Sequence, residues 1–166
     1  MPSPRSGRRS SGENEMNDTQ HAPLAKKSPL HDFLAPGSIA IIGASADPTK
    51  RGYKAMVGLI QDGYRGRIYP INPKTPEILG IKTLPDLAAL PAGVDLALVC
   101  TPAASVPAII AQCGERGVRG AVILASGFRE SGADGAALED QALTAAQAGG
   151  VRLISRPKPD QDSQDG

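Results

Sequence analysis

Aromatic side chains are scarce in this sequence of 166 residues, which contains no Trp, three Tyr and two Phe. Proteins that bind single-stranded nucleic acids stack successive bases on aromatic side chains, and so few aromatics offer little surface for stacking. A basic excess is also missing, because 18 Lys and Arg face 17 Asp and Glu for a net charge of +1. Neutralising a long track of phosphates requires such an excess. The composition therefore predicts that nucleic acid is not a partner.

Cysteine and histidine are rarer still, with two residues of each type. Two Cys cannot build a disulfide framework or a Cys-rich zinc site, so we expect Cys100 and Cys113 to be small buried hydrophobes. Both histidines, His21 and His31, precede the first predicted strand. The globular body thus lacks the side chain used most often for proton transfer, and the sequence predicts no catalytic residue and no metal ligand.

Long apolar runs are absent too. No segment approaches the roughly 18 apolar residues of a membrane span, and the N-terminus lacks the apolar stretch of about seven residues that a secretory signal needs. These absences predict a cytoplasmic protein without a membrane partner. Residues 1–29 are rich in Ser, Pro, Gly and Arg and predict a disordered tail, residues 30–154 one domain, and residues 155–166 a polar C-terminal tail.

Within the domain, short apolar runs alternate with segments of helical periodicity. Strands are predicted over residues 38–43, 67–71, 94–100, 119–125 and 151–154, and helices over residues 51–62, 85–90, 103–116 and 133–148. Strands that alternate with helices form βαβ units with parallel strands. Continuous apolar runs indicate strands covered on both faces. The predicted fold is therefore α/β, with a doubly wound, mainly parallel, Rossmann-like sheet and helices on both faces.

Ligands of such sheets bind in the loops that follow the strands. The first loop contains small residues that allow a phosphate to approach closely. It also contains a hydroxyl group, and basic residues stand at the start of the next helix. These are Gly43, Ala44, Ser45, Lys50, Arg51 and Gly52. The spacing matches neither G-x-G-x-x-G nor a Walker A motif. A tight strand-to-helix turn without a ligand is the alternative interpretation.

The second loop is Asn72-Pro73-Lys74. Domains that bind NAD usually place an acidic residue here for the ribose 2′-hydroxyl. Lys74 suits a phosphate on the ribose instead, which disfavours NAD and leaves NADP or coenzyme A. The alternative is an exposed lysine in an Asn-Pro turn.

Two further loops are candidates. Thr101-Pro102-Ala103 follows the third long strand, where Thr101 could simply cap the next helix. Ser126-Gly127-Phe128 follows the fourth, with Glu130 nearby, and either a turn or a ligand contact fits it.

Taken together, these loops resemble the coenzyme-A-binding domain of the NDP-forming acyl-CoA synthetases, relatives of the succinyl-CoA synthetase α-subunit. The similarity is carried by the blocks SIAIIGAS, YPINPK, LPDLAALPAGVDLALVCTPA, GAVILASGF and GVRLI. It extends from about Phe33 to Ile154. Because these blocks are long and collinear, they are more specific than any single glycine loop.

The resemblance implies coenzyme A, or an acyl-CoA, as the ligand. Gly43, Ala44 and Ser45 would cradle a phosphate or the pantetheine amides, with Lys50 and Gly52 behind them. Asn72, Pro73 and Lys74 would lie along the nucleotide end, with Lys74 near phosphate. Thr101, Pro102 and Ala103 would flank the nucleotide or the pantetheine, and Ser126 and Gly127 would lie toward the pantetheine arm.

In the family, the last strand leads into a Gly-Pro-Asn loop, a domain with a phosphorylated histidine, and an ATP-grasp domain. Here Ser155-Arg156-Pro157 follows instead. The resemblance therefore implies a CoA-binding module that does not catalyse alone, either a truncated or frameshifted product or one that works with a chain carrying the missing domains. A stand-alone CoA-binding regulatory protein, an NADP-binding oxidoreductase or redox sensor, and a non-catalytic scaffold remain open as alternatives.

Overall fold

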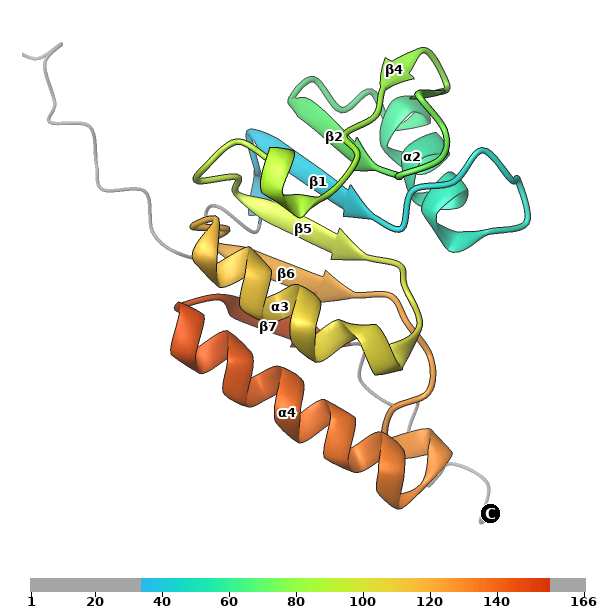
Figure 1. Cartoon of the computed structure of the whole chain (residues 1–166). Coiled ribbons are helices and arrows are strands. Elements are labelled where there is room, and N and C mark those ends of the chain that lie inside the picture. Colours follow the sequence, from blue (N-terminus) through green and yellow to red (C-terminus); the bar gives the residue numbers. More distant parts are fainter. Residues whose placement is uncertain (1–33, 156–166) are drawn as a thin grey trace, which may run out of the picture.

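The computed structural model describes residues 34–155, so the predicted disordered tail over residues 1–29 lies outside the described residues. Its main feature is a five-stranded sheet in the order β2-β1-β5-β6-β7. The strands are β1 (Ser38–Ile42), β2 (Arg67–Ile71), β5 (Leu96–Val99), β6 (Gly120–Ile123) and β7 (Arg152–Ser155). Every neighbouring pair is parallel. The predicted doubly wound, Rossmann-like α/β sheet is confirmed (Figure 1).

The strands form where the sequence is continuously apolar because both faces of the sheet are covered. Side chains alternate between the two faces of a strand. In β1, Ile39 and Ile41 contribute to one apolar cluster, whereas Ala40 and Ile42 contribute to the other. All four are nearly inaccessible to solvent. A polar residue at any of these positions would face a packed layer.

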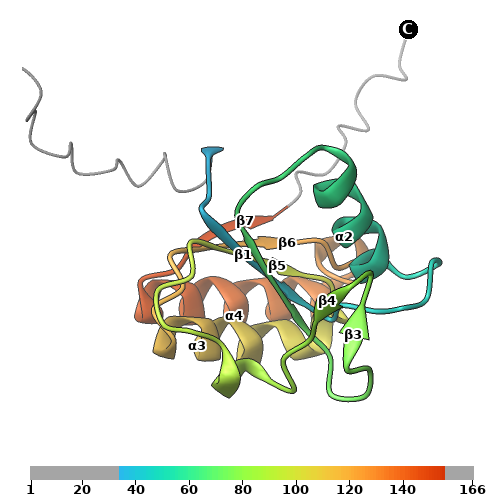
Figure 2. The same cartoon turned by 90° about the horizontal axis from the view of Figure 1, so that it is seen from above.

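Helices cover both faces, as predicted. Figure 2 shows α3 (Val106–Glu115) and α4 (Ala133–Gly149) on one side of the sheet and α2 (Arg51–Gln61) on the other. The first two helices pack closely where Gly114 meets Gly149, since a Cβ on Gly114 would lie 2.7 Å from the Cα of Gly149. On the opposite face, Met56 of α2 is fully buried against β1 and β5.

Several local elements differ from the predictions. An unpredicted antiparallel hairpin joins β3 (Glu77–Ile78) to β4 (Ile81–Lys82). Its two turn residues, Leu79 and Gly80, have φ of 51° and 79°, which suits the twist of a two-residue hairpin. The helix predicted over residues 85–90 is one 3-10 turn, η2 (Leu87–Ala89). The helix predicted from residue 103 starts as the 3-10 turn η3 (Ala103–Ser105) and becomes α-helical at Val106.

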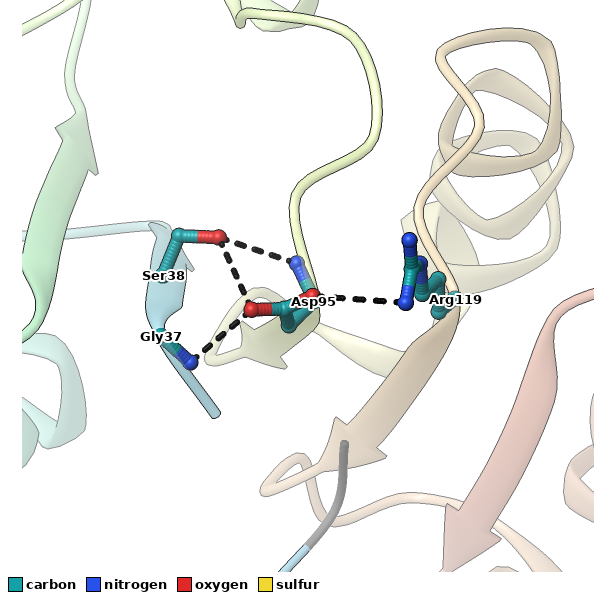
Figure 3. A network of polar contacts seen from close by, with 4 residues as sticks. All are labelled: Gly37, Ser38, Asp95 and Arg119. Carbon is teal, nitrogen blue, oxygen red and sulfur yellow. Dashed lines mark hydrogen bonds and ion pairs between the residues drawn. The ribbon is translucent and has the colours of Figure 1, made fainter. Parts of the chain in front are cut away.

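A polar network holds the edge of the sheet where the strands begin (Figure 3). The backbone N–H of Gly37 donates to Oδ2 of Asp95 at 2.8 Å, and the N–H of Asp95 donates to Oγ of Ser38 at 3.1 Å. Arg119 approaches the same carboxylate, with Nη1 3.9 Å from Oδ1. These residues lie at the starts of β1, β5 and β6, so they fix three strands at the edge opposite the candidate loops.

Candidate functional site

The four predicted loops lie together at the carboxyl edge of the sheet. They follow β1, β2, β5 and β6, whose arrowheads point to the same side in Figure 1. Counted along the chain, the five strands of this sheet have the order 2-1-3-4-5, and the direction of winding reverses between β1 and β5. Doubly wound sheets bind their ligands in the crevice at such a reversal.

The first and third loops touch at this reversal. Gly43 has a φ of +83°, and a Cβ on it would lie 2.9 Å from Cγ2 of Thr101 and 3.2 Å from the carbonyl carbon of Cys100. Only glycine combines this backbone angle with so close an approach. Gly52 is equally constrained, because a Cβ there would overlap the carbonyl oxygen of Gly43. The first turn of α2 therefore sits directly on the end of β1.

The remainder of the first loop is held by its own polar groups. Oγ of Ser45 accepts a hydrogen bond from the N–H of Asp47 at 3.1 Å. The Asp47 carboxylate accepts from the N–H of Thr49 at 2.9 Å and from its hydroxyl at 2.7 Å, which lowers the pKa of Asp47. Lys50 is the N-cap of α2 and makes no side-chain capping bond. Lys50 and Arg51 at the start of α2 are exposed, and the N–H groups of a helix N-terminus are donors of the kind that bind anions.

The second loop is organised by Asn72. Its Nδ2 donates to the carbonyl oxygen of Ala44 at 2.8 Å, and its Oδ1 accepts from the N–H of Lys74 at 2.7 Å and of Thr75 at 2.9 Å. With these bonds, the Asn72 side chain connects the second loop to the first and fixes the turn that carries Lys74. Its role in the structure is to position the loop.

A hollow of about 200 Å³ lies beside Lys74. It is lined by residues of the second loop and by residues that follow the hairpin, namely Asn72, Pro73, Lys74, Thr75, Pro76, Thr83 and Pro85. Lys74 and Pro73 are exposed, whereas Thr83 is buried and donates a hydrogen bond from its hydroxyl to the carbonyl oxygen of Thr75. Sequence reasoning missed the wall that follows the hairpin. The glycine that follows the apolar pair Ile78-Leu79 and precedes Ile81 was the available signal.

In the third loop, Thr101 does not cap the following helix, so the capping interpretation is wrong. The N-cap of η3 is Pro102, and Thr101 precedes it by one residue. Oγ1 of Thr101 is buried and finds no hydrogen-bond partner within the described part of the chain. A buried hydroxyl without a partner is unusual in proteins, and the methyl group of the same side chain lies close to Gly43 at the winding reversal.

The fourth loop packs against the third. Gly127 has a φ of +107°, and a Cβ on it would lie 3.2 Å from the Cβ of Ala103. The N–H of Gly127 donates to the Glu130 carboxylate at 2.6 Å, and this bond lowers the pKa of Glu130. Glu130 belongs to the 3-10 turn η4 (Arg129–Ser131). Arg129 secures that turn to α4 through Glu139, with Nε 2.8 Å from Oε2.

Arg51 also reaches the fourth loop, although only its positive charge could be expected from the sequence. Its Nη1 donates to the carbonyl oxygen of Leu124, and its Nη2 lies 3.4 Å from Oγ of Ser126. The acceptors are more than seventy positions away in the chain, so no local pattern could have indicated this contact.

Both cysteines are poor nucleophiles. Burial raises the pKa of Cys100 to about 11 and that of Cys113 to about 12, whereas thiol reactivity requires the thiolate. Cys113 is fully buried, as expected, and Cys100 is partly buried at the end of β5. Among residues 34–155 there is no group of three potential metal ligands. The same residues include no helix that is long and apolar enough to cross a membrane.

Comparison with known families decides what kind of domain this is. A family described as the CoA binding domain matches residues 37–157. The chain belongs to this CoA-binding domain family. It is 41% identical over 125 residues to ADP-forming acetate–CoA ligase II of Archaeoglobus fulgidus, covering 75% of this chain and 19% of the relative. It is also 41% identical over 129 residues to the α-subunit of ADP-forming acetate–CoA ligase I of Pyrococcus furiosus, covering 75% and 28%.

A solved structure agrees with this membership. The dinucleotide-forming acetyl-coenzyme A synthetase 1 of Candidatus Korarchaeum cryptofilum, in complex with phosphate and ADP, superposes with a TM-score of 0.71 at 37% identity. The match covers 75% of this chain and 26% of that one. The expected relation to NDP-forming acyl-CoA synthetases is therefore confirmed for the domain. The chain spans less than a third of the length of these relatives.

Proposed function

We propose that this CoA-binding domain binds coenzyme A across the carboxyl edge of its sheet. The observation that carries the proposal is that all four loops lie at the carboxyl edge of the sheet, on either side of the winding reversal between β1 and β5, in a member of this family. Two of these loops meet at the contact between Gly43 and Thr101. The nucleotide end lies at Lys74, and the pantetheine arm extends toward Ser126 and Gly127.

The residues present fit such a ligand. The exposed ammonium of Lys74, beside the hollow of about 200 Å³, supplies the charge for the ribose phosphate of coenzyme A. The uncapped first turn of α2 and the side chain of Lys50 supply donors for the diphosphate. The Thr101 hydroxyl, which has no partner within the described residues, supplies one more hydrogen bond at the centre of the edge.

The glycines of the site allow its loops to approach one another closely. Gly43 and Gly52 bring the first loop and the start of α2 together. Gly127 allows the fourth loop to lie against Ala103. When bound, coenzyme A supplies the thiol that accepts an acyl group, and the part of this chain described here binds and orients it.

The complete ligase reaction belongs, in this proposal, to a larger assembly. The matched region is 19% and 28% of the length of two related ligases, which are thus about four to five times as long, and one of them is an α-subunit. The described residues include no histidine, so they offer no imidazole to relay a phosphoryl group. We assign that step to additional domains, carried by another chain or by another part of the protein, in a cytoplasmic complex.

The place of the nucleotide can be tested with coenzyme A and dephospho-CoA, which lacks the ribose phosphate. Lys74→Ala is expected to weaken coenzyme A about tenfold, equivalent to one charge-assisted hydrogen bond of about 1.5 kcal/mol, and to leave dephospho-CoA unchanged. Lys82→Ala is the matched control, because Lys82 is an exposed lysine of β4 that does not line the hollow. Equal losses for both ligands would remove Lys74 from the ribose-phosphate position. Tight NADP binding without competition from coenzyme A would favour the oxidoreductase alternative instead.

A further inference from the structure

The side chain of Arg51 crosses the carboxyl edge of the sheet from the first loop to the fourth. Arg51 is the first residue of α2. Its Nη1 donates to the carbonyl oxygen of Leu124, just past the end of β6, and its Nη2 lies 3.4 Å from Oγ of Ser126. A guanidinium presents its donors in a rigid planar fork. One side chain therefore contacts two residues at the start of the fourth loop.

In the part of the chain that the structure describes, the guanidinium of Arg51 contacts neutral oxygen atoms and not carboxylates. Within the described residues, no carboxylate forms an ion pair with Arg51. The bond from the Gly127 N–H is the main cause that lowers the pKa of Glu130, and burial is the main cause that raises the pKa of Cys100; the charge of Arg51 makes a smaller contribution that lowers both. Both acceptors of its hydrogen bonds are neutral.

The fourth loop has few other ties to the first. The last ladder bond at the end of β6 is donated by the N–H of Leu124 to the carbonyl oxygen of Val99. Beyond it, Ser126 is exposed and Gly127 has a backbone angle that suits glycine alone. The bond from Gly127 to Glu130 stays within the fourth loop. Among residues 34–155, the contacts of Arg51 with Leu124 and Ser126 join the first loop to the fourth.

We propose that Arg51 is a positioning residue that sets the separation of the first and fourth loops and thereby determines how well the site accepts the pantetheine arm of coenzyme A. This inference rests on the proposed function. The nucleotide end does not depend on Arg51, because the second loop is fixed to the first by the bond from Asn72 to Ala44. Loss of the Arg51 contacts with Leu124 and Ser126 should therefore weaken binding of the pantetheine half of the ligand and leave binding of the nucleotide half unchanged.

The two halves can be titrated separately into the full chain, using 4′-phosphopantetheine and adenosine 3′,5′-bisphosphate, with NMR chemical shifts as the readout for weak affinities. Arg51→Met is expected to weaken coenzyme A and 4′-phosphopantetheine about tenfold and to leave the bisphosphate within twofold. Arg51→Lys keeps the charge but cannot donate to both acceptors in a fixed fork, so it restores only part of the affinity. Lys54→Met, which removes an exposed charge one turn along the same helix, should change none of the three.

Amide hydrogen exchange provides a readout that needs no ligand. Amides of residues 125–131 should exchange at least threefold faster in Arg51→Met than in the wild type, while those of β1 and β5 keep their rates. Equal weakening of both halves would show a general effect on the fold or the field and overturn the proposal. Full rescue by Arg51→Lys, or unchanged exchange in the loop, would do the same. If the folded wild-type protein binds neither half of the ligand nor coenzyme A, the proposed function fails. The exchange data then still show separately whether Arg51 positions the fourth loop.

Discussion

The side-chain amide of Asn72 donates a 2.8 Å hydrogen bond to the carbonyl oxygen of Ala44. This bond joins the loop after β2 to the loop after β1. The same side chain accepts bonds from the N–H groups of Lys74 and Thr75. One partly buried amide therefore determines where the lysine proposed to contact the ribose phosphate stands relative to the first loop.

Asn72→Ala should lower the free energy of unfolding by about 2 kcal/mol, because it leaves Ala44, Lys74 and Thr75 with unpaired backbone groups. It should also weaken coenzyme A although it removes no charge. Urea unfolding and calorimetry measure the two effects. Gln147→Ala, at an exposed position of α4, is the control and should stay within about 0.5 kcal/mol of the wild type. An Asn72→Ala protein as stable as the wild type would refute this role.

Two glycines of the same helix should respond to alanine in opposite directions. A Cβ at Gly52 would overlap the carbonyl oxygen of Gly43, whereas a Cβ at Gly58 meets nothing within 4 Å. Gly58→Ala is expected to stabilise the protein by about 0.5–1 kcal/mol through helix propensity. Gly52→Ala is expected to destabilise it by at least about 2 kcal/mol, because the end of β1 and α2 must separate. Thermal unfolding of the pair gives the comparison, and a stabilised Gly52→Ala protein would contradict the packing described here.

Thr101→Val should increase the stability of the protein and weaken its binding of coenzyme A. The buried hydroxyl has no partner among residues 34–155, so its removal should raise the free energy of unfolding, by about 1 kcal/mol. If the hydroxyl bonds to the ligand, the same change should weaken coenzyme A about fivefold. Denaturant unfolding and calorimetry on one protein preparation measure both. A loss of stability would mean that the hydroxyl is paired in the protein without ligand.

The fully buried thiol of Cys113 predicts a loss of stability in alkali. Burial raises its pKa from 9.0 to about 12. Between these two pKa values the unfolded chain binds fewer protons than the folded chain. The free energy of unfolding therefore falls as the pH rises above about 9. Below about pH 9 the neutral thiol contributes fully to stability. The slope reaches about 1.4 kcal/mol per pH unit. Urea unfolding between pH 8 and 11 should show a shallower fall for Cys113→Ala than for the wild type, and parallel curves would exclude this titration.

The sequence predicted the sheet because buried parallel strands leave a strong signal. The apolar runs that contain β1 and β5 admit few other interpretations. The hairpin of β3 and β4 escaped prediction since strands of two residues show no periodicity. The capping interpretation of Thr101 was wrong because the next turn begins one residue later, at Pro102.

For some site residues the sequence predicted the location, whereas for others their contacts could not be predicted. That the four loops share one edge follows from parallel topology, so Gly43 and Thr101 could be placed near each other from the sequence alone. The positioning role of Asn72 depends on which of its atoms faces Ala44, and no spacing rule gives that. The contact of Arg51 with Leu124 and Ser126 depends on the direction in which an exposed side chain leaves α2. Such directions are decided by tertiary packing.

Isothermal titration of coenzyme A into the full chain measures whether the carboxyl edge of the sheet binds this ligand. We expect saturable binding of one coenzyme A per chain, weakened about tenfold by Lys74→Ala and unchanged by Lys82→Ala, with no competition from NADP. Absence of binding to a chain shown by circular dichroism to be folded would contradict it.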